Sequence, residues 1–428
     1  MIRYDSYKNS GVEWIGEIPN HWDLSKIKFL LKKRNEKNNP VITDNILSLS
    51  IKKGVTLQSE KPTGGNKPKD DLSKYNIVQK NDIVINSMNV IVGSVGLSKY
   101  FGLVSPVYYI LYSNNENLEI RYYDFLFSGK QFQKSLIGEG NGIMILESSN
   151  GKLNTIRMRI PYEKLGNKEF PVPPLSEQQQ IVSFLDTKTS LIDSLIKKTQ
   201  RKIELLKEKR TSLINEVVTK GLNPNVEMKD SGVEWIGEIP SHWEITKMKF
   251  GVNHLSEKGK PDKTDIKISP ENVESDTGVC FNLYSEHESD GMRFQSGDIL
   301  LNKLRLYLKK ILFTEYDGFS LGEMIVLRTN NKLNNKYFYQ LLFSQGLIDL
   351  LDSQSTGIKL PRVSPDVILN TEIVYPPLNE QQQIVEYLDE QTQLIDKTIS
   401  IEEKRIELLK EYRQSLISEV ATGKRKVG

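Results

Sequence analysis

The chain has 428 residues, of which 38% are hydrophobic and 26% are charged, and its formal net charge is only +3. This composition is typical of soluble globular proteins and excludes disordered and membrane chains. No apolar run reaches the roughly 18–20 residues of a membrane-spanning helix, and the first residues contain no apolar signal segment. We therefore expect a cytoplasmic protein with no membrane partner.

Two sequence motifs each occur twice. Residues 10–19 (SGVEWIGEIP) recur unchanged as residues 231–240, and a His-Trp pair follows each copy after one residue. Residues 173–182 (PPLSEQQQIV) recur with one substitution as residues 376–385. A duplicated chain of this length favours two to four domains in a pseudo-two-fold arrangement.

The repeats divide the chain into four segments, because each half has a globular segment followed by a helical one. The expected boundaries are 1–175 and 222–378 for the globular segments, and 176–221 and 379–428 for the helical segments, the last with a basic tail. Each globular segment combines strands and helix, so the expected fold class is α+β.

Short runs rich in β-branched and aromatic residues predict strands, and apolar residues at helical spacing predict one helix in each globular segment. The strands are expected at residues 82–86, 108–112, 298–302 and 324–327, and the helices at residues 121–133 and 336–351. The offset between matched residues then falls from about 216 to 203. The first half therefore carries about a dozen extra residues, which we place around residues 148–168.

Each remaining segment is predicted as one long helix. Its start follows a Pro-Pro pair and resembles a capping box, and Gly221 or Gly423 ends it. Apolar residues alternate at spacings of four and three, which is the heptad pattern of a coiled coil. The candidate seam residues are Ile192, Ile196, Ile203, Leu206 and Leu213 in one helix, and Ile395, Ile399, Ile406, Leu409 and Leu416 in the other.

An apolar seam of this kind needs a partner, because long amphipathic helices are seldom stable alone. We expect the two helices of one chain to pair with each other. Two pseudo-symmetric globular domains would then be joined by an antiparallel coiled coil. The alternative is that the helices mediate homodimerisation.

The sequence contains few residues that could perform catalysis. It has no phosphate-binding GxxxxGK[ST] loop, no GxGxxG motif and no HExxH motif, and Cys280 is its only cysteine. Asp366 together with Glu402 and Lys404 imitates a nuclease pattern, but Glu402 falls in the predicted seam of a helix. We interpret the four tryptophans, at positions 14, 22, 235 and 243, as buried structural residues. A chain without catalytic activity of its own is the simplest interpretation.

Positive charge is concentrated locally in the second globular segment. Lys303, Arg305, Lys309 and Lys310 lie in one short stretch, and Lys359 and Arg362 lie in another. Such clusters are typical of nucleic-acid-binding surfaces, and they also occur as ordinary solvated patches.

The two repeated motifs, in this order and occurring twice, resemble the specificity subunit of type I restriction-modification enzymes over almost the whole chain. Residues 297–305 (GDILLNKLR) and 356–362 (TGIKLPR) resemble motifs of its target recognition domains. The resemblance implies two such domains, each of which reads one half of a bipartite DNA site. It also implies that the two helices fix the spacing between the half-sites and bind partners.

The resemblance also implies the partners. They are double-stranded DNA, two methyltransferase (modification) subunits and restriction (translocase) subunits. S-adenosylmethionine, ATP and Mg²⁺ would be bound by these partner subunits, and this chain would hold no cofactor. The alternative function is a coiled-coil adaptor whose two globular ends bind proteins.

The two halves differ where DNA contacts are expected. The second half has Asn302, Lys303 and Arg305, whereas the first has Asn86, Ser87 and Asn89 at the matching positions. Lys and Arg suit guanine or phosphate, and Asn suits adenine, so the site should be asymmetric. These six residues, with Lys359 and Arg362, are the candidate DNA-binding residues.

Overall fold

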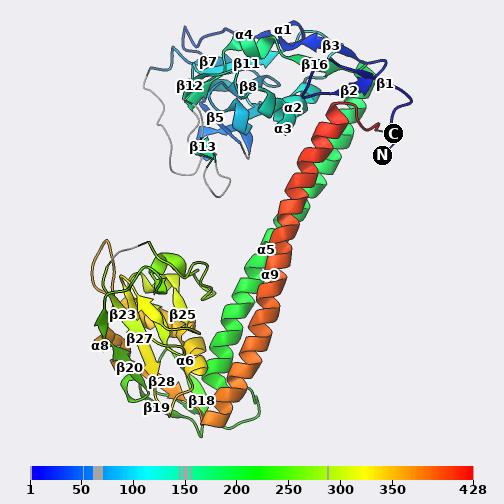
Figure 1. The fold of residues 1–428 in the computed structure, drawn as a ribbon. Helices are drawn as coiled ribbons and strands as arrows, with labels where there is room; N and C mark the ends of the chain where they lie inside the picture. Colours follow the sequence, from blue (N-terminus) through cyan, green and yellow to red (C-terminus); the bar gives the residue numbers. More distant parts are fainter. Residues whose placement is uncertain are drawn as a thin grey trace. The chain divides into compact units, whose positions relative to one another are not determined.

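The computed structural model describes residues 2–427 apart from residues 52, 61–70, 144–145, 148–152, 155–156 and 287–288. The chain forms two compact units, and Figure 1 colours them by sequence. The first unit comprises Met1–Lys198 and Arg405–Gly428, and the second comprises Thr199–Lys404. Each unit therefore contains one globular domain and one part of each long helix. Within the described residues, no helix combines the length and apolarity needed to cross a membrane.

The globular domain of the first unit is built on a four-stranded antiparallel sheet with the strand order β4-β11-β8-β9. The strands of this unit are β1 Tyr7–Asn9, β2 Glu17–Pro19, β3 Asp23–Lys26, β4 Lys32–Lys33, β5 Leu47–Ser50, β6 Gly54–Leu57, β7 Asn76–Val78, β8 Ile83–Asn86, β9 Val95–Leu97, β10 Gly102–Val104, β11 Tyr108–Tyr112, β12 Asn141–Ile143, β13 Leu146–Glu147, β14 Leu153–Asn154, β15 Arg157–Arg159 and β16 Glu169–Val172. Its short helices are α1 Ile27–Leu30, α2 Ile120–Ser128, α3 Lys130–Ser135 and α4 Tyr162–Gly166.

The second unit repeats this sheet as β20-β27-β24-β25. Its strands are β17 Met228–Asp230, β18 Glu238–Pro240, β19 Glu244–Lys247, β20 Val252–Leu255, β21 Lys258–Gly259, β22 Lys267–Ile268, β23 Gly291–Phe294, β24 Ile299–Asn302, β25 Ile311–Phe313, β26 Gly318–Ser320, β27 Met324–Thr329 and β28 Glu372–Tyr375. Its short helices are α6 Asn335–Leu342, α7 Gln345–Ser353 and α8 Pro365–Asn370. Two domains of mixed α and β structure and two long helices confirm the α+β class.

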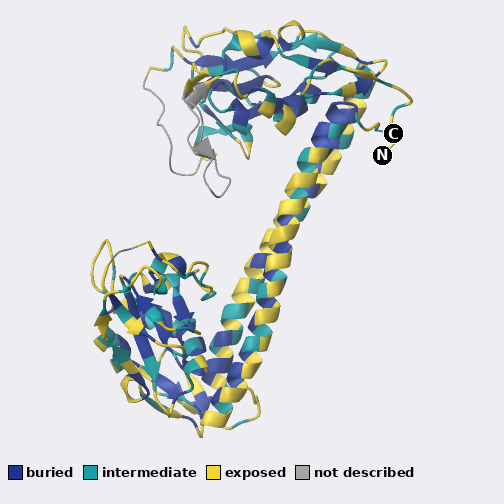
Figure 2. Ribbon diagram, in the orientation of Figure 1, coloured by how far each residue is buried: buried dark blue, intermediate teal, exposed yellow. Residues whose placement is uncertain are grey.

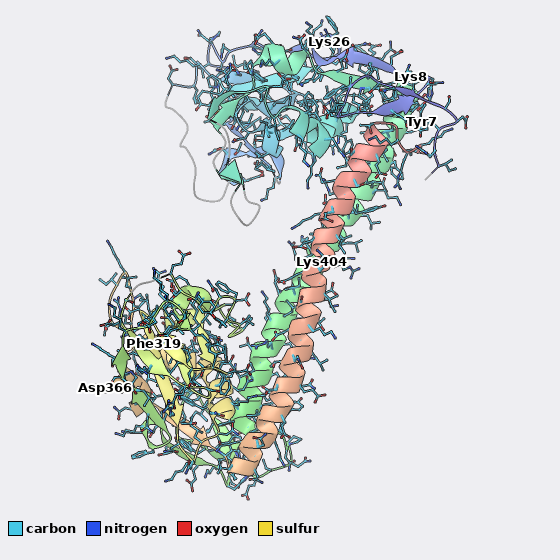
Figure 3. All side chains as sticks on the ribbon, in the orientation of Figure 1. Tyr7, Lys8, Lys26, Phe319, Asp366 and Lys404 are labelled. Carbon is cyan, nitrogen blue, oxygen red and sulfur yellow. The ribbon has the colours of Figure 1, made fainter. Side chains whose placement is uncertain are left out.

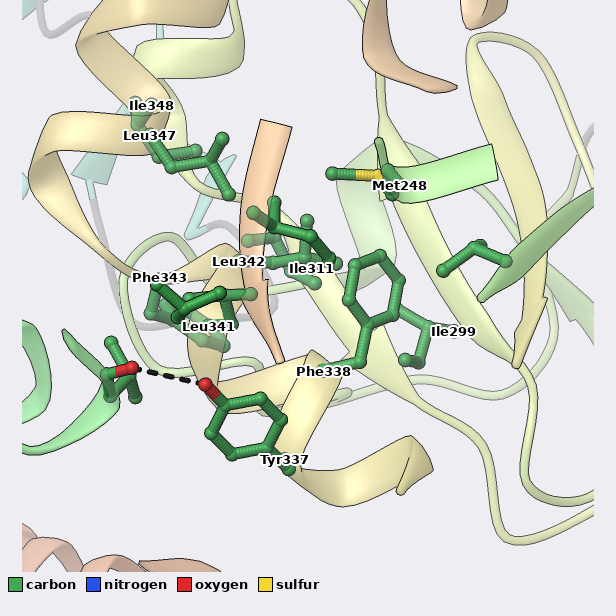
Figure 4. Packing of buried hydrophobic residues seen from close by; sticks show 14 of the residues in the cluster. Met248, Ile299, Ile311, Tyr337, Phe338, Leu341, Leu342, Phe343, Leu347 and Ile348 are labelled. Carbon is green, nitrogen blue, oxygen red and sulfur yellow. Dashed lines mark hydrogen bonds between the residues drawn. The ribbon is translucent and has the colours of Figure 1, made fainter. Parts of the chain in front are cut away.

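The two inner strands of each four-stranded sheet, β8 and β11 or β24 and β27, are buried on both faces, which explains why they are apolar runs without alternation. Alternate side chains of a strand point to opposite faces. In the second unit, Ile299 and Leu301 of β24 pack on helices α6 and α7, whereas Leu300 packs in a separate cluster with Phe294. Figure 4 shows the helix-side cluster, in which Tyr337 donates a hydrogen bond to the carbonyl of Val218 at 3.0 Å.

The two predicted single helices are each broken into two. Residues 121–133 form α2 and α3, and residues 336–351 form α6 and α7. The breaks lie at Gly129 and Ser344, whose backbones are extended, with ψ of 129° and 126°. Neither residue is proline, which would have marked a break in the sequence. The apolar spacing continues through both breaks and therefore predicted one helix.

In the sequence, the extra residues of the first half lie between the paired strands β12 and β15. Asn141 pairs with Arg159 in the first unit, as Thr356 pairs with Arg362 in the second, and the first connection is about a dozen residues longer. Parts of this connection, including residues 148–152, lie outside the described residues. The predicted range 148–168 extends too far, because α4 and β16 already match α8 and β28 of the second unit.

The two long helices are α5, Leu175–Lys220, and α9, Leu378–Ala421. Each begins one residue before the predicted start. Within the second unit, Lys202 pairs with Glu402 at 2.6 Å and Arg210 pairs with Asp396 at 3.1 Å. The residue number falls on α9 as it rises on α5, so the helices are antiparallel. In the first unit, Arg413 of α9 pairs with Asp193 of α5 at 3.0 Å.

The predicted seam lies between these helices. Six of its ten residues are buried, and the other four are half-buried, so none of the ten is exposed. Figure 2 shows buried and exposed residues alternating along both helices. The buried residues are Ile192, Ile203, Ile395, Ile399, Ile406 and Leu416, and the half-buried ones are Ile196, Leu206, Leu213 and Leu409. The seam therefore accounts for the pairing within one chain, without a second copy.

Each globular domain binds the start of one long helix through a pair of identical contacts. In the first unit, Glu177 of α5 accepts hydrogen bonds from His21 at 2.6 Å and from the indole N–H of Trp22 at 3.0 Å. In the second unit, Glu380 of α9 accepts the same two bonds from His242 and Trp243. The two repeated motifs thus contact each other, and the expectation that Trp22 and Trp243 are buried is confirmed. Trp14 and Trp235 are half-buried.

The same tryptophans also contact the end of the other long helix. Gly221 follows α5 and Gly423 follows α9, with φ of 72° and 75°. A side chain at Gly221 would meet Trp243 at 3.0 Å, and one at Gly423 would meet Trp22 at 2.7 Å. Glycine is required at both positions because the backbone is left-handed and the indole ring occupies the space of a Cβ atom.

We predict that the seam and the exposed side of α9 respond differently to the same substitution. Leu416→Ala should lower the free energy of unfolding by about 2–5 kcal/mol, because it empties a buried site. Leu408→Ala, on the same helix but 53% exposed, should change it by less than about 0.5 kcal/mol. Urea denaturation of both variants measures the difference, and equal losses would contradict the assignment of the seam.

Candidate nucleic-acid interface

In both units, the candidate residues at matching positions lie at the end of an inner strand of the sheet, β8 or β24, or directly after it. The strand ends at Asn86 or Asn302, whose side-chain oxygen accepts a hydrogen bond from the backbone N–H two residues later, at 3.0 Å and 3.1 Å. This local turn directs the chain into a short 3-10 helix, Val90–Val92 or Leu306–Leu308. The two asparagines therefore shape the loop that carries the neighbouring candidates.

Two of the eight candidates are not at the surface, which corrects the sequence-based prediction for them. Asn302 is 4% exposed, and Ser87 is fully buried with its hydroxyl donating to the carbonyl of Val107 at 2.7 Å. Both side chains are engaged inside the domain, so in this conformation neither is available to a base edge. Asn86 and Asn89 are half-buried.

The remaining candidates of the second unit come together. Arg305 lies in the loop after β24, and its backbone N–H donates to the carbonyl of Pro361 at 2.9 Å. Val363 donates in the same way to the carbonyl of Lys303 at 3.1 Å. The hairpin around Lys359 is closed by two hydrogen bonds between Thr356 and Arg362. The two basic stretches, which are separated by about 50 residues in the sequence, thus form one surface.

One carboxylate, which the sequence analysis did not single out, lies among these cations. Glu323 lies directly before β27. Its carboxylate accepts hydrogen bonds from Arg362 Nε and Nη2 at 2.9 Å and 2.8 Å, and it pairs with Lys303 at 3.6 Å. The hydrogen bond from Arg362 and the charge of Lys303 keep the pKa of Glu323 below its usual value, so this group is ionised at neutral pH. We name Lys303, Arg305, Glu323, Lys359 and Arg362 the second-unit charge cluster.

The tip of the hairpin adds exposed apolar side chains to this cluster. Ile358 is entirely exposed, and Leu360 is 45% exposed, on either side of Lys359. Gly357 has φ of 100°, which only glycine adopts without strain, and it turns the chain at the tip. Charged and apolar groups are therefore presented together, as a DNA groove requires.

Two lysines of the predicted basic stretch do not belong to this surface. Lys309 is 5% exposed, and its ammonium donates to the carbonyl of Phe343 at 3.3 Å and to Gln345 Oε1 at 2.6 Å. Burial lowers the pKa of Lys309. Lys310 donates to the carbonyl of Pro270 at 2.6 Å. The proximity of four cations in the sequence therefore overstates the local positive charge at the surface.

The first unit places different side chains on the same frame. Ile160 donates to the carbonyl of Ser87 at 2.9 Å, as Val363 does to that of Lys303, so Arg159 is the counterpart of Arg362. Val107, which accepts from Ser87, is the counterpart of Glu323. Arg159 and Glu323 were not among the predicted residues, although the offsets of 203 and 216 residues between the halves match them to Arg362 and Val107.

The nuclease-like pattern is not assembled. Asp366 lies in the first turn of α8, and Lys404 lies on α9, on separate parts of the second unit (Figure 3). Glu402 is buried in the helix pair beside Lys202. Across the part of the chain that the structure describes, no group of three or more His, Cys, Asp or Glu side chains could bind a metal ion.

Comparison with known proteins identifies the family. The family model for the type I restriction modification DNA specificity domain matches residues 15–205 and 286–411. The chain belongs to this family. It is therefore the DNA specificity component of a type I restriction-modification system, as the resemblance in the sequence predicted.

Relatives and solved structures extend the likeness over nearly the whole chain. It is 25% identical to the type I restriction enzyme MjaVIII specificity subunit of Methanocaldococcus jannaschii, over 96% of this chain and 94% of that protein. A structure described for assembly and conformational transition of the type I R-M system aligns with a TM-score of 0.69 and 13% identity, over 94% and 98% of the two chains. The HsdS subunit from Thermoanaerobacter tengcongensis aligns with a TM-score of 0.53 and 13% identity, over 95% and 98%. These structures confirm the fold.

We predict opposite effects for two neighbouring cations. Lys309→Ala should lower the free energy of unfolding by about 1–3 kcal/mol, because it leaves a buried carbonyl without its donor. Arg305→Ala should leave stability within about 0.5 kcal/mol and weaken DNA binding. Both residues have positive φ, 45° and 52°, so alanine meets the same backbone strain in each case.

Thermal unfolding and DNA binding by fluorescence anisotropy distinguish the two roles. A stable Lys309→Ala protein with weakened DNA binding would assign that lysine to the interface. An Arg305→Ala protein with unchanged affinity and unchanged methylation specificity would remove Arg305 from it.

Proposed function

We propose that this chain reads a bipartite, asymmetric DNA site and scaffolds methyltransferase and restriction subunits, without catalysing a reaction itself. The observation that supports this most is the contrast between the two units. The two units share the strand order of the sheet, the asparagine turn after its inner strand, and the contact between the His-Trp pair and the start of a long helix. The side chains on the loops after β8 and β24 differ between the units. Different side chains on the same frame are what two different half-sites require.

The two long helices link the two globular domains, which we call the readers because each reads one half-site. Both α5 and α9 run without a break from one unit into the other. In this proposal they set the spacing between the two half-sites, because a helix rises 1.5 Å per residue and does not stretch. S-adenosylmethionine, ATP and Mg²⁺ belong to the partner subunits, and the complex acts in the cytoplasm because its target is the DNA of the cell.

The helices also carry apolar side chains that the seam does not use. On α9, Tyr387, Leu394, Ile401 and Leu408 are seven residues apart and between 37% and 59% exposed. On α5, Leu191 and Leu205 are also exposed. We name these six residues the helix stripe.

The geometry of the helix stripe suits a further helix. Its Leu and Ile members each precede a seam position by one residue, and in an antiparallel pair such positions of both helices lie on the same side. A heptad-spaced apolar stripe is the surface that a partner helix covers in a helical bundle. We assign it to the methyltransferase subunits, and the occurrence of such residues in both units supports two of them.

The function is tested by exchanging one reader. The chain is reconstituted with its methyltransferase subunits, and methylated sites are mapped before and after residues 25–172 are replaced by those of a relative. We expect one half-site to change while the other half-site and the spacer persist. An unchanged site would contradict the proposal.

Salt dependence separates a DNA reader from the alternative, a protein-binding adaptor. The logarithm of the DNA affinity should fall linearly with the logarithm of the salt concentration, because each phosphate contact releases a counterion. An adaptor would show no specific binding to DNA and no such slope.

The role of the helix stripe is tested with matched alanine variants. Leu408→Ala and Leu191→Ala should weaken methyltransferase binding by at least about tenfold, since buried anchors dominate such interfaces. Lys410→Ala, an exposed residue on the other flank of the α9 seam, should leave binding unchanged. Calorimetric titration measures all three, and equal affinities would assign the methyltransferase to another surface.

A further inference from the structure

We propose that Arg362 reads a guanine in the half-site bound by the second unit, and that Glu323 is the positioning residue that orients it. This inference rests on the proposed function. It identifies which member of the second-unit charge cluster reads a base and why its neighbours do not.

The guanidinium group of Arg362 is oriented by Glu323 and keeps donors for a second partner. Arg362 directs Nε and Nη2 to a single oxygen of Glu323, Oε1, at 2.9 Å and 2.8 Å. A guanidinium has five N–H donors in a planar fork. Nη1 of Arg362 donates one proton to the carbonyl of Leu360 at 3.5 Å, so the second Nη2 proton and the other Nη1 proton remain for a further acceptor. Two donors in that plane match O6 and N7 of guanine in the major groove. The side chain is 45% exposed, so this edge is accessible to DNA.

Backbone hydrogen bonds hold the segments that carry Arg362 and Glu323 in place. Arg362 exchanges two hydrogen bonds with Thr356, at 2.8 Å and 2.9 Å. Lys303 donates its backbone N–H to the carbonyl of Glu323 at 3.0 Å and accepts from Val363. The pair of Arg362 and Glu323 therefore connects two segments that are already joined by backbone hydrogen bonds through Lys303. An oriented guanidinium loses less conformational freedom when it binds a base.

The charge of Glu323 makes Arg362 better suited to a base than to a phosphate. An ionised carboxylate next to Arg362 repels a phosphate and offsets the charge of the arginine. It repels the uncharged acceptors of a guanine much less than it repels a phosphate, and it can itself accept from a cytosine amino group. Arg305 and Lys359 are both exposed, and we assign them to the DNA backbone.

The first unit supports this distinction. Its counterpart of Arg362 is Arg159, which is exposed, and its counterpart of Glu323 is Val107. The carboxylate is therefore a feature of the second reader alone and not of the shared frame. We expect the two half-sites to differ at the base pair that this position contacts.

The experiment uses the complete complex with its methyltransferase subunits and a library in which each half-site is randomised in turn. The wild-type complex should require a G·C pair at one position of the second half-site. Arg362→Ala should reduce discrimination at that pair by on the order of 10- to 100-fold and leave the first half-site unchanged. Arg362→Lys should not restore it, because an ammonium lacks the fork.

The role of Glu323 is read from specificity and salt dependence. Glu323→Val, which introduces the residue of the first unit, should reduce discrimination at the same pair and strengthen binding to non-specific DNA. Glu323→Gln keeps an acceptor oxygen and should retain more discrimination than Glu323→Val. Lys359→Ala is the matched control, and it should weaken all sequences alike and reduce the salt slope by about one.

Each outcome distinguishes this inference from the function on which it rests. A wild-type complex without sequence preference would contradict the proposed function. A specific wild-type complex in which Arg362→Ala weakens all sequences equally would make Arg362 a phosphate contact and overturn the inference. Wild-type discrimination in a folded Glu323→Val complex, checked by thermal unfolding, would remove the positioning role.

Discussion

Each long helix depends on one carboxylate in its first turn, Glu177 in α5 and Glu380 in α9. This carboxylate accepts from a histidine and from the indole N–H of a fully buried tryptophan. A buried indole N–H without an acceptor is costly, so the helix start and the domain are stable only together. The next residue, Gln178 or Gln381, is also buried, and its side chain joins the backbone before the long helix to the backbone N–H of the residue that precedes α2 or α6. These contacts explain why the two motifs repeat almost without change, since each motif is the binding partner of the other.

The sequence allowed most of the fold to be predicted, because the features that define it are periodic or repeated. None of the ten residues that the heptad spacing assigned to the seam is exposed, and the repeats located the start of each long helix to within one residue. The contact between the motifs was not predictable, because spacing along the chain does not show which distant residues meet. The breaks at Gly129 and Ser344 were also missed, since the apolar face continues across them.

The candidate site was harder to predict because a polar residue looks the same in sequence whether it is buried or exposed. Lys309 illustrates this. In the second unit its ammonium reaches the carbonyl of Phe343 at the end of α6, whereas in the first unit Gln133 donates to the carbonyl of Phe127 near the end of α2. Gly93 occupies the position of Lys309 and leaves space for that glutamine. One structural requirement is thus met from two different elements. Lys309 resembles a DNA contact only when its neighbours in the sequence are considered alone.

The same exchange occurs at the buried aspartates that precede the central strands, and it shows how this frame tolerates different readers. Asp82 pairs with Arg34 from the end of the edge strand β4, and Asp298 pairs with Arg328 from β27, the neighbour of the edge strand. Inside the domain, then, a change at one position is matched by a change at another, so the frame persists while the sequence varies. The exposed side chains of Arg305 and Lys359 take no part in these pairs. A change there alters the groups presented to DNA without a compensating change elsewhere, which is what the evolution of new specificity on an old scaffold requires.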